Sequence, residues 1–204
     1  MTRVELKDKA KQSLKGNWEE AIKMQVIYLL ISFGVGIVEG FIVANFNFSE
    51  SASSVFSDIT SIILSALFML GITSFYMKLA RKEKVTYNEL FSKINMFKVT
   101  LVVLILVGLY TTLWTLLLII PGIIASISYS QVYYIMIDNP EMTAIEAIKK
   151  SKEIMQGHKM DYFILSLSFL GWAILCLLTL GIGTLWLIPY MNVTMVNFYD
   201  SIKS

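Results

Sequence analysis

The chain has 204 residues, of which 56% are hydrophobic and 16% are charged, and its formal net charge is +2. Charged residues make up about a quarter of a soluble domain, so this composition excludes an ordinary soluble fold and indicates a helical membrane protein. The basic residues lie beside apolar stretches and form no separate basic face, so no nucleic-acid partner is expected. A single cysteine, Cys176, excludes an intramolecular disulfide and a cysteine-based metal site.

Three apolar stretches follow one another along the chain. They cover residues 21–77, with a polar break at 45–58, then residues 99–137, and finally residues 162–202. A membrane-spanning helix needs about 20 residues, so each stretch is long enough to cross twice. We therefore expect an all-α polytopic fold with six transmembrane helices arranged as three hairpins.

Basic residues flank both ends of every apolar stretch and predict its orientation. They include Lys15 and Lys78 around the first stretch, Lys98 and Lys149 around the second, and Lys152 and Lys203 around the third. Lys and Arg concentrate on the cytoplasmic side of membrane proteins, so both termini are expected in the cytoplasm. The outer connections are then the polar break at 45–58 and tight turns at 121–122 and 181–183.

The segments that precede the hairpins carry helix start signals. Residues 2–5, 86–89 and 143–146 each begin with Thr and end with Glu, which is the capping-box pattern. They predict a short cytoplasmic interfacial amphipathic helix before each hairpin. The chain is then a single integral membrane domain over 1–204, with pseudo-repeats at about 1–80, 81–138 and 139–204.

Glycines and apolar stripes define the first and third of these surface helices. Gly16 and Gly157 occupy equivalent positions, at which a helix is expected to end. The apolar stripes are expected to lie along the inner membrane surface, and a solvated linker helix is the alternative. The stripes consist of Leu6, Ala10, Leu14 and Trp18 in the first helix, and of Ala144, Ala147, Ile148, Ser151 and Met155 in the third.

Several motifs in the second half resemble those of a known family. They are Pro121-Gly122-Ile123-Ile124-Ala125, Asp138-Asn139-Pro140, Gly157-His158-Lys159, Thr179-Leu180-Gly181-Ile182-Gly183 and Pro189-Tyr190. In these motifs the chain resembles the bacterial integral membrane family called domain of unknown function 975. The resemblance implies a multi-pass protein of the bacterial cytoplasmic membrane, found mostly in Gram-positive bacteria. It implies no activity and no functional residue.

The first apolar stretch contains one embedded acidic residue, Glu39, within Gly36-Ile37-Val38-Glu39-Gly40. A carboxylate at membrane depth is costly, so Glu39 is a candidate for ion or substrate binding. Because it lies near the outer end of its span, it could instead reach water or headgroups. Gly36 and Gly40 form a GxxxG pattern that would let another helix approach closely, and packing is the favoured interpretation.

The other candidate residues lie where spans are interrupted. Pro121 and Gly122 are followed by Ser130 and Gln131, which could line a cavity between broken helices. The alternative is a simple hairpin turn. Asn192 lies beyond a proline in the last stretch and needs a partner, so this helix is expected to face protein and not lipid.

No catalytic, cofactor-binding or metal-binding residue is predicted, because His158 is the single histidine and is expected to cap a helix C-terminus. We therefore expect a non-enzymatic accessory or scaffold protein, or an envelope-stress or immunity protein. Its partners would be the lipid bilayer and other membrane proteins or further copies of itself. A small transporter, channel or lipid-translocating protein is the alternative, and an intramembrane enzyme acting on lipid headgroups is the third hypothesis.

Overall fold

The computed structural model describes residues 1–46 and 48–203, and the regular elements in this part of the chain are helices. In chain order they are α1 (Arg3–Leu14), α2 (Trp18–Asn45), α3 (Glu50–Ala80), η1 (Tyr87–Phe91), η2 (Ile94–Met96), α4 (Phe97–Leu117), α5 (Ile119–Tyr129), α6 (Val132–Asp138), α7 (Ala144–Ile154), α8 (Lys159–Leu167), α9 (Leu170–Leu178) and α10 (Thr184–Ile202).

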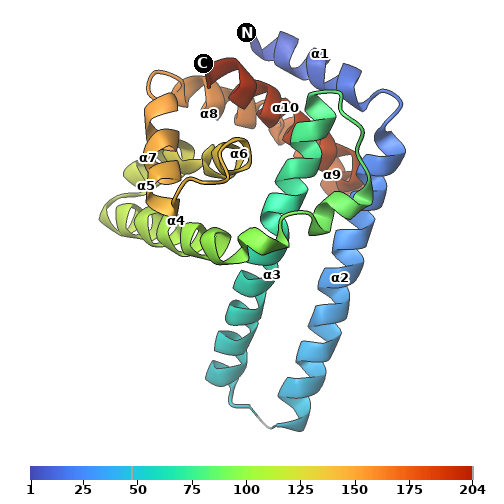
Figure 1. The fold of residues 1–204 in the computed structure, drawn as a ribbon. Helices are drawn as coiled ribbons and strands as arrows, with labels where there is room; N and C mark the ends of the chain where they lie inside the picture. The colour runs from blue at the N-terminus through green and yellow to red at the C-terminus, as the bar shows by residue number, and fades with distance from the viewer. Residues whose placement is uncertain (47, 204) are drawn as a thin grey trace.

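The longest elements, α2 and α3, lie side by side as a hairpin that projects from the rest of the molecule (Figure 1). With 28 and 31 residues they are long enough for the bilayer core of about 30 Å. The Ser49 hydroxyl accepts a hydrogen bond from the Ala52 N–H, so α3 begins at Glu50. The prediction of an outer loop over 45–58 was therefore wrong for residues 50–58, which are helical because of this cap. Asn47, in the same predicted loop, lies outside the described residues.

Two of the three predicted capping boxes are confirmed. Thr2 and Glu5 cap α1 reciprocally, and Thr143 and Glu146 do the same for α7. The box predicted at 86–89 was wrong, because this segment forms the short 3-10 helix η1 and the Thr86 side chain makes no capping bond.

The middle segment is instead held against α3. The Glu89 carboxylate accepts a hydrogen bond from Lys78 Nζ at 2.6 Å, so it is not available for capping. Gly71 on α3 allows the backbone of η1 to come unusually close: a Cβ at this position would lie 2.1 Å from the Leu90 carbonyl oxygen. The second hairpin therefore lacks the preceding amphipathic α-helix that the sequence predicted.

The glycines at 16 and 157 are confirmed as points where the chain turns after a helix. Both have a left-handed conformation, with φ of +86° at Gly16 and +81° at Gly157, which favours glycine. The apolar stripes of α1 and α7 are, however, buried in the protein. Leu6, Ala10 and Leu14 are 0–3% exposed and the α7 stripe is at most 7% exposed, so the expectation that these residues would face the membrane surface was wrong. Trp18, the last residue of the first stripe, belongs to α2 and is half-buried.

The two tight turns lie close to where the sequence placed them. The α4–α5 turn is made by Leu118, whose backbone is extended, so Pro121 and Gly122 belong to the first turn of α5 and not to the turn itself. Pro121 is tolerated there because the first N–H groups of a helix have no intrahelical partner. The α9–α10 turn contains Gly181 at φ +87°, as predicted.

The core is formed by the second half of α3 and by α10. Phe75, Tyr76 and Met77 on α3 are at most 1% exposed, and residues 193–199 of α10 are all buried. Helices α1, α2 and α3 contact α10. The prediction that the last helix faces protein is therefore confirmed.

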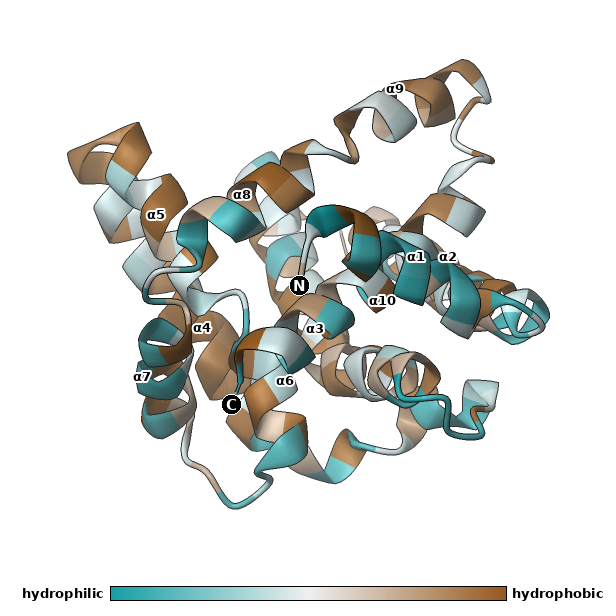
Figure 2. Ribbon diagram, turned by 90° about the horizontal axis from the view of Figure 1, so that it is seen from above, coloured by the Kyte–Doolittle hydropathy of each residue, from teal (hydrophilic) through white to brown (hydrophobic). Residues whose placement is uncertain are grey.

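Five helical stretches are long and apolar enough to cross a membrane. They are Trp18–Asn45, Glu50–Ala80, Tyr87–Leu117, Ile119–Asp138 and Lys159–Leu178. Figure 2 shows hydrophobic ribbon along α5 and α9, which lie at the periphery of the molecule. The chain is thus built as a multi-pass helical membrane protein. The N- and C-termini lie near each other at one end of the molecule (Figure 1).

Candidate functional site

The residues singled out from the sequence do not come together in one site. Glu39, Gly36 and Gly40 lie on the projecting part of α2, whereas Pro121 and Gly122 begin α5. Ser130 and Gln131 form the break between α5 and α6, and Asn192 lies on α10. They are distributed over four places in the fold.

Glu39 faces the neighbouring helix of its own hairpin. Its carboxylate accepts a hydrogen bond from the Ser57 hydroxyl on α3, and the residue is half-buried. Outside the backbone of their own helix and their two chain neighbours, Gly36 and Gly40 have no atom within 4 Å of the position that a Cβ would take. The GxxxG face therefore makes no close helix contact within the described chain and is free for one outside it.

Gly122, unlike Gly36 and Gly40, lies where two helices approach closely. A Cβ at this position would lie 2.1 Å from Thr115 Oγ1 and 2.8 Å from the Thr115 Cα. The Thr115 hydroxyl donates a hydrogen bond to the Thr111 carbonyl oxygen, one turn earlier in α4. Gly122 thus serves the packing of α4 on α5.

The break at 130–131 is a buried polar contact between helices. The Ser151 hydroxyl on α7 donates a hydrogen bond to the Ser128 carbonyl oxygen at 2.8 Å and accepts one from the Gln131 N–H at 3.3 Å. The Gln131 side chain donates to the Ser130 hydroxyl, but its buried Oε1 atom has no partner. These groups satisfy backbone polarity exposed by the break, and they hold α7 in place.

Asn192 donates a hydrogen bond to the Ile188 carbonyl oxygen, one turn earlier in α10. Its neighbour Asn197, which is 1% exposed, donates to the Leu6 carbonyl oxygen on α1 at 3.3 Å. His158 is the N-cap residue of α8 and makes no side-chain capping bond to that helix; its imidazole lies 3.7 Å from the Asp161 carboxylate.

Sequence reasoning missed a cluster of charges that joins the ends of three helices. Arg81, just after α3, donates hydrogen bonds to Asp138 at the end of α6, at 2.8 and 2.9 Å, and to Asp200 near the end of α10, at 2.8 and 3.3 Å. Lys203 binds both carboxylates, at 3.0 and 2.8 Å. The Tyr199 hydroxyl also donates to Asp138.

The charges of this Arg81 cluster balance, with two cations and two carboxylates. The hydrogen bonds to Asp138 and Asp200 raise the pKa of Arg81 further above its usual range. Burial alone would lower the pKa of Lys203, but its bonds to Asp200 and Asp138 outweigh burial and raise it. In the sequence, these four residues share one feature: each lies at or shortly after the end of an apolar stretch. The paired residues are up to 119 positions apart in the chain, so the sequence does not reveal the pairing.

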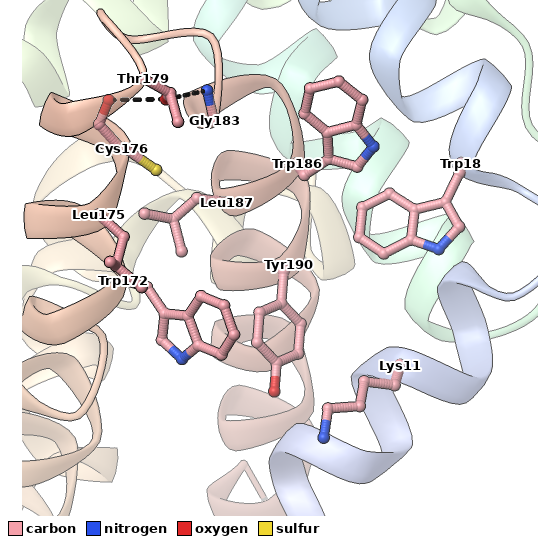
Figure 3. A pocket seen from close by; sticks show the side chains of 10 residues that line it. All are labelled: Lys11, Trp18, Trp172, Leu175, Cys176, Thr179, Gly183, Trp186, Leu187 and Tyr190. Atoms are coloured by element: carbon pink, nitrogen blue, oxygen red, sulfur yellow. Dashed lines mark hydrogen bonds between the residues drawn. The ribbon is translucent and has the colours of Figure 1, made fainter.

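A mainly apolar cavity, called the aromatic cavity below, lies between α1, α9 and α10, with Trp18 at the start of α2 also lining it. Its volume is about 420 Å³. Figure 3 shows that Trp172 from α9 and Trp186 and Tyr190 from α10 lie on one side, facing Trp18 and Lys11 across the gap. Its other lining residues are Leu175, Cys176, Thr179, Gly183 and Leu187. This lining suits an apolar ligand, and the cationic side chain of Lys11 lies at the edge of the cavity.

Comparison with protein-family models gives a match to "Protein of unknown function (DUF975)" over residues 1–128 and 115–204. The two matched segments together cover the whole chain. Searches of curated proteins and of solved structures gave no match. The matched family carries no assigned activity, in agreement with the resemblance seen in the sequence motifs. The chain belongs to the DUF975 family.

Proposed function

We propose that this chain is a multi-pass protein of the bacterial cytoplasmic membrane that acts by binding and not by catalysis. Its role would be that of an accessory or scaffold subunit, or of an envelope-stress or immunity protein. In this proposal six helices cross the membrane as three hairpins, and both termini are cytoplasmic.

The hydrogen-bond partners of the polar side chains support this proposal. Arg81, Asp138 and Asp200 bind one another at helix ends, and Ser151 binds the backbone of a neighbouring helix. Catalysis needs titratable groups that converge on a substrate cavity. The aromatic cavity has one charged lining residue, Lys11. These four polar side chains thus serve helix association, which suits a binding role.

The arrangement of the helix ends supports the proposed topology. The end of α3, the start of α1 and the end of α10 all lie at one end of the molecule (Figure 1). The first hairpin therefore leaves and returns to one side, as its flanking lysines require. The sixth span would be α10, which has 19 residues. Since protein and not lipid surrounds much of α10, it can carry Asn192 and Asn197 despite its position in the membrane.

A partner is best sought with the GxxxG face of α2. Cross-linking in native membranes, followed by purification of a tagged chain, should recover either a second copy or another membrane protein. Replacing Gly36 and Gly40 together with isoleucine should reduce this recovery, because bulky side chains block close helix approach. Val38→Leu, on the exposed opposite side of the same helix, is the matched control. A chain that stays monomeric, recovers no partner and has no phenotype under envelope stress would contradict the proposal.

A second function, transport of an ion or lipid, is favoured by two buried amides. The side-chain oxygens of Gln131 and Asn197 have no hydrogen-bond partner in the described chain, and both residues are at most 1% exposed. Such groups commonly bind water, and linked waters could form a polar path. Reconstituted vesicles should then show flux that Gln131→Leu abolishes. Absence of flux from vesicles containing the folded wild-type protein would exclude this function.

A further inference from the structure

The aromatic cavity between α1, α9 and α10 has a lining that is unusual for a surface in contact with water. Trp172 is 55% exposed and Trp186 is 47% exposed, and both border the cavity together with Leu187. Exposed apolar side chains of this size mark a contact with lipid or with another protein. Because α9 belongs to one of the five candidate spans, lipid is the expected solvent at its surface.

The cavity also lies at the level where charged headgroups meet the apolar core. Lys11 is on α1, and the first span begins at Trp18, only seven residues later. Tryptophan and tyrosine concentrate at this interface because their rings are apolar and their N–H or O–H groups are polar. Figure 3 shows the Tyr190 hydroxyl and the Lys11 ammonium group pointing toward the same end of the cavity.

The positive charge of residues 3–15 indicates that the ligand is anionic. Residues 3–15 contain five basic and two acidic residues, so the segment carries a net charge of +3. Lys11 Nζ lies 3.2 Å from the Asp8 carboxylate, but both side chains are more than half exposed. Exposed pairs of this kind are weak, so a phosphate can compete for the ammonium group. Basic residues near a membrane surface attract anionic lipids by about 1 kcal/mol each.

We propose that this cavity binds one anionic phospholipid from the leaflet in which α1 lies. An acyl chain occupies the space between Trp18, Trp172 and Trp186, and the phosphate is bound at Lys11. The cavity volume of about 420 Å³ lies within the range of ordinary ligand sites, roughly 300–1,000 Å³. The site requires only that the protein is embedded in a membrane, and it does not depend on the scaffold role.

Native mass spectrometry of the purified full chain tests this site directly. The delipidated protein is titrated with an equimolar mixture of phosphatidylglycerol and phosphatidylcholine that have identical acyl chains. We expect one phosphatidylglycerol molecule to be retained, with roughly a fivefold preference over phosphatidylcholine. Both lipids carry a phosphate, but the choline ammonium group neutralises it in phosphatidylcholine, so only phosphatidylglycerol presents a net negative charge to Lys11. Lys11→Gln should bring the ratio close to one. Lys9→Gln removes a charge from the same helix, at an exposed residue that does not line the cavity, and should keep the preference.

A second variant separates the role of the acyl chain from that of the headgroup. Leu175→Trp adds bulk to the cavity wall and should reduce retention of both lipids equally, leaving their ratio unchanged. Thermal unfolding of each variant verifies that it is folded, and the comparison of Lys11→Gln with Lys9→Gln remains decisive if Leu175→Trp does not fold. Equal retention of the two lipids by the wild-type protein, or a preference that persists in Lys11→Gln, would overturn the proposal and leave annular lipid contact only.

Discussion

Replacing Arg81 with alanine removes the cation that joins the ends of α3, α6 and α10. The guanidinium group donates four hydrogen bonds to Asp138 and Asp200, at 2.8–3.3 Å. Breaking a buried pair costs about 3–5 kcal/mol. The three side chains are 18–27% exposed, so water screens part of this interaction. Lys203 also remains bound to both carboxylates. We therefore expect a loss of about 2–3 kcal/mol in the free energy of unfolding.

Thermal unfolding in detergent micelles, followed by tryptophan fluorescence, measures this loss. For a chain of this size, 1 kcal/mol shifts the Tm by about 2–4 °C, so Arg81→Ala should lower it by roughly 4–12 °C. Lys84→Ala removes the same charge from an exposed side chain nearby and should have little effect. Adding Asp138→Asn and Asp200→Asn to Arg81→Ala should recover part of the loss, since it removes the uncompensated carboxylates. An unchanged Tm in Arg81→Ala would refute the reasoning.

Three further substitutions test packing in the same assay. Gly71→Ala should cost about 1–3 kcal/mol, because its Cβ would collide with the Leu90 carbonyl oxygen; Gly40→Ala, where nothing lies within 4 Å, should instead stabilise the helix slightly. Gly157→Ala should cost about 1–2 kcal/mol because φ there is +81°, and an unchanged Tm would show that the turn can relax. Ser151→Ala should cost about 1–3 kcal/mol, since it leaves the Ser128 carbonyl and the Gln131 N–H without this partner. Ser126→Ala, at an exposed position, is the control, and an equal loss of stability in that variant would contradict this prediction.

Local signals predicted much of the secondary structure. Hydropathy and the flanking lysines placed the helices of the first hairpin, because a membrane span depends mainly on the composition of its own residues. The caps at Thr2 and Thr143 and the turns at Gly16 and Gly157 were also predictable, since each depends on a few adjacent residues. The outer loop predicted at 45–58 was too long, because the cap at Ser49 and the serines of the first turn of α3 are also typical of loops.

Tertiary contacts could not be predicted in this way. The segment at 86–89 has the residue types of a capping box, but Glu89 binds Lys78, and the backbone of η1 packs against Gly71. Arg81 was visible only as a topology charge, and nothing in the sequence paired it with Asp138 or Asp200. Such contacts depend on how helices far apart in the chain pack together.

The candidate site was predicted least well for the same reason. The lining of the aromatic cavity comes from α1, α2, α9, the following turn and α10, and its tryptophans are separated by up to 168 residues. Glu39, chosen as a charge at membrane depth, binds Ser57 on the adjacent helix. The polar face around Ser130 and Gln131 receives α7, in contacts that the sequence alone does not reveal.

Cysteine accessibility in intact cells tests the topology most directly. In a Cys176→Ser background, single cysteines are introduced at Ser51, in the first turn of α3, and at Lys84, after the end of α3; both positions are exposed. A membrane-impermeant maleimide should label Ser51→Cys in intact cells and Lys84→Cys only after the membrane is permeabilised. Labelling of Lys84→Cys in intact cells, with Ser51→Cys protected until permeabilisation, would contradict the account of three hairpins that begin and end in the cytoplasm.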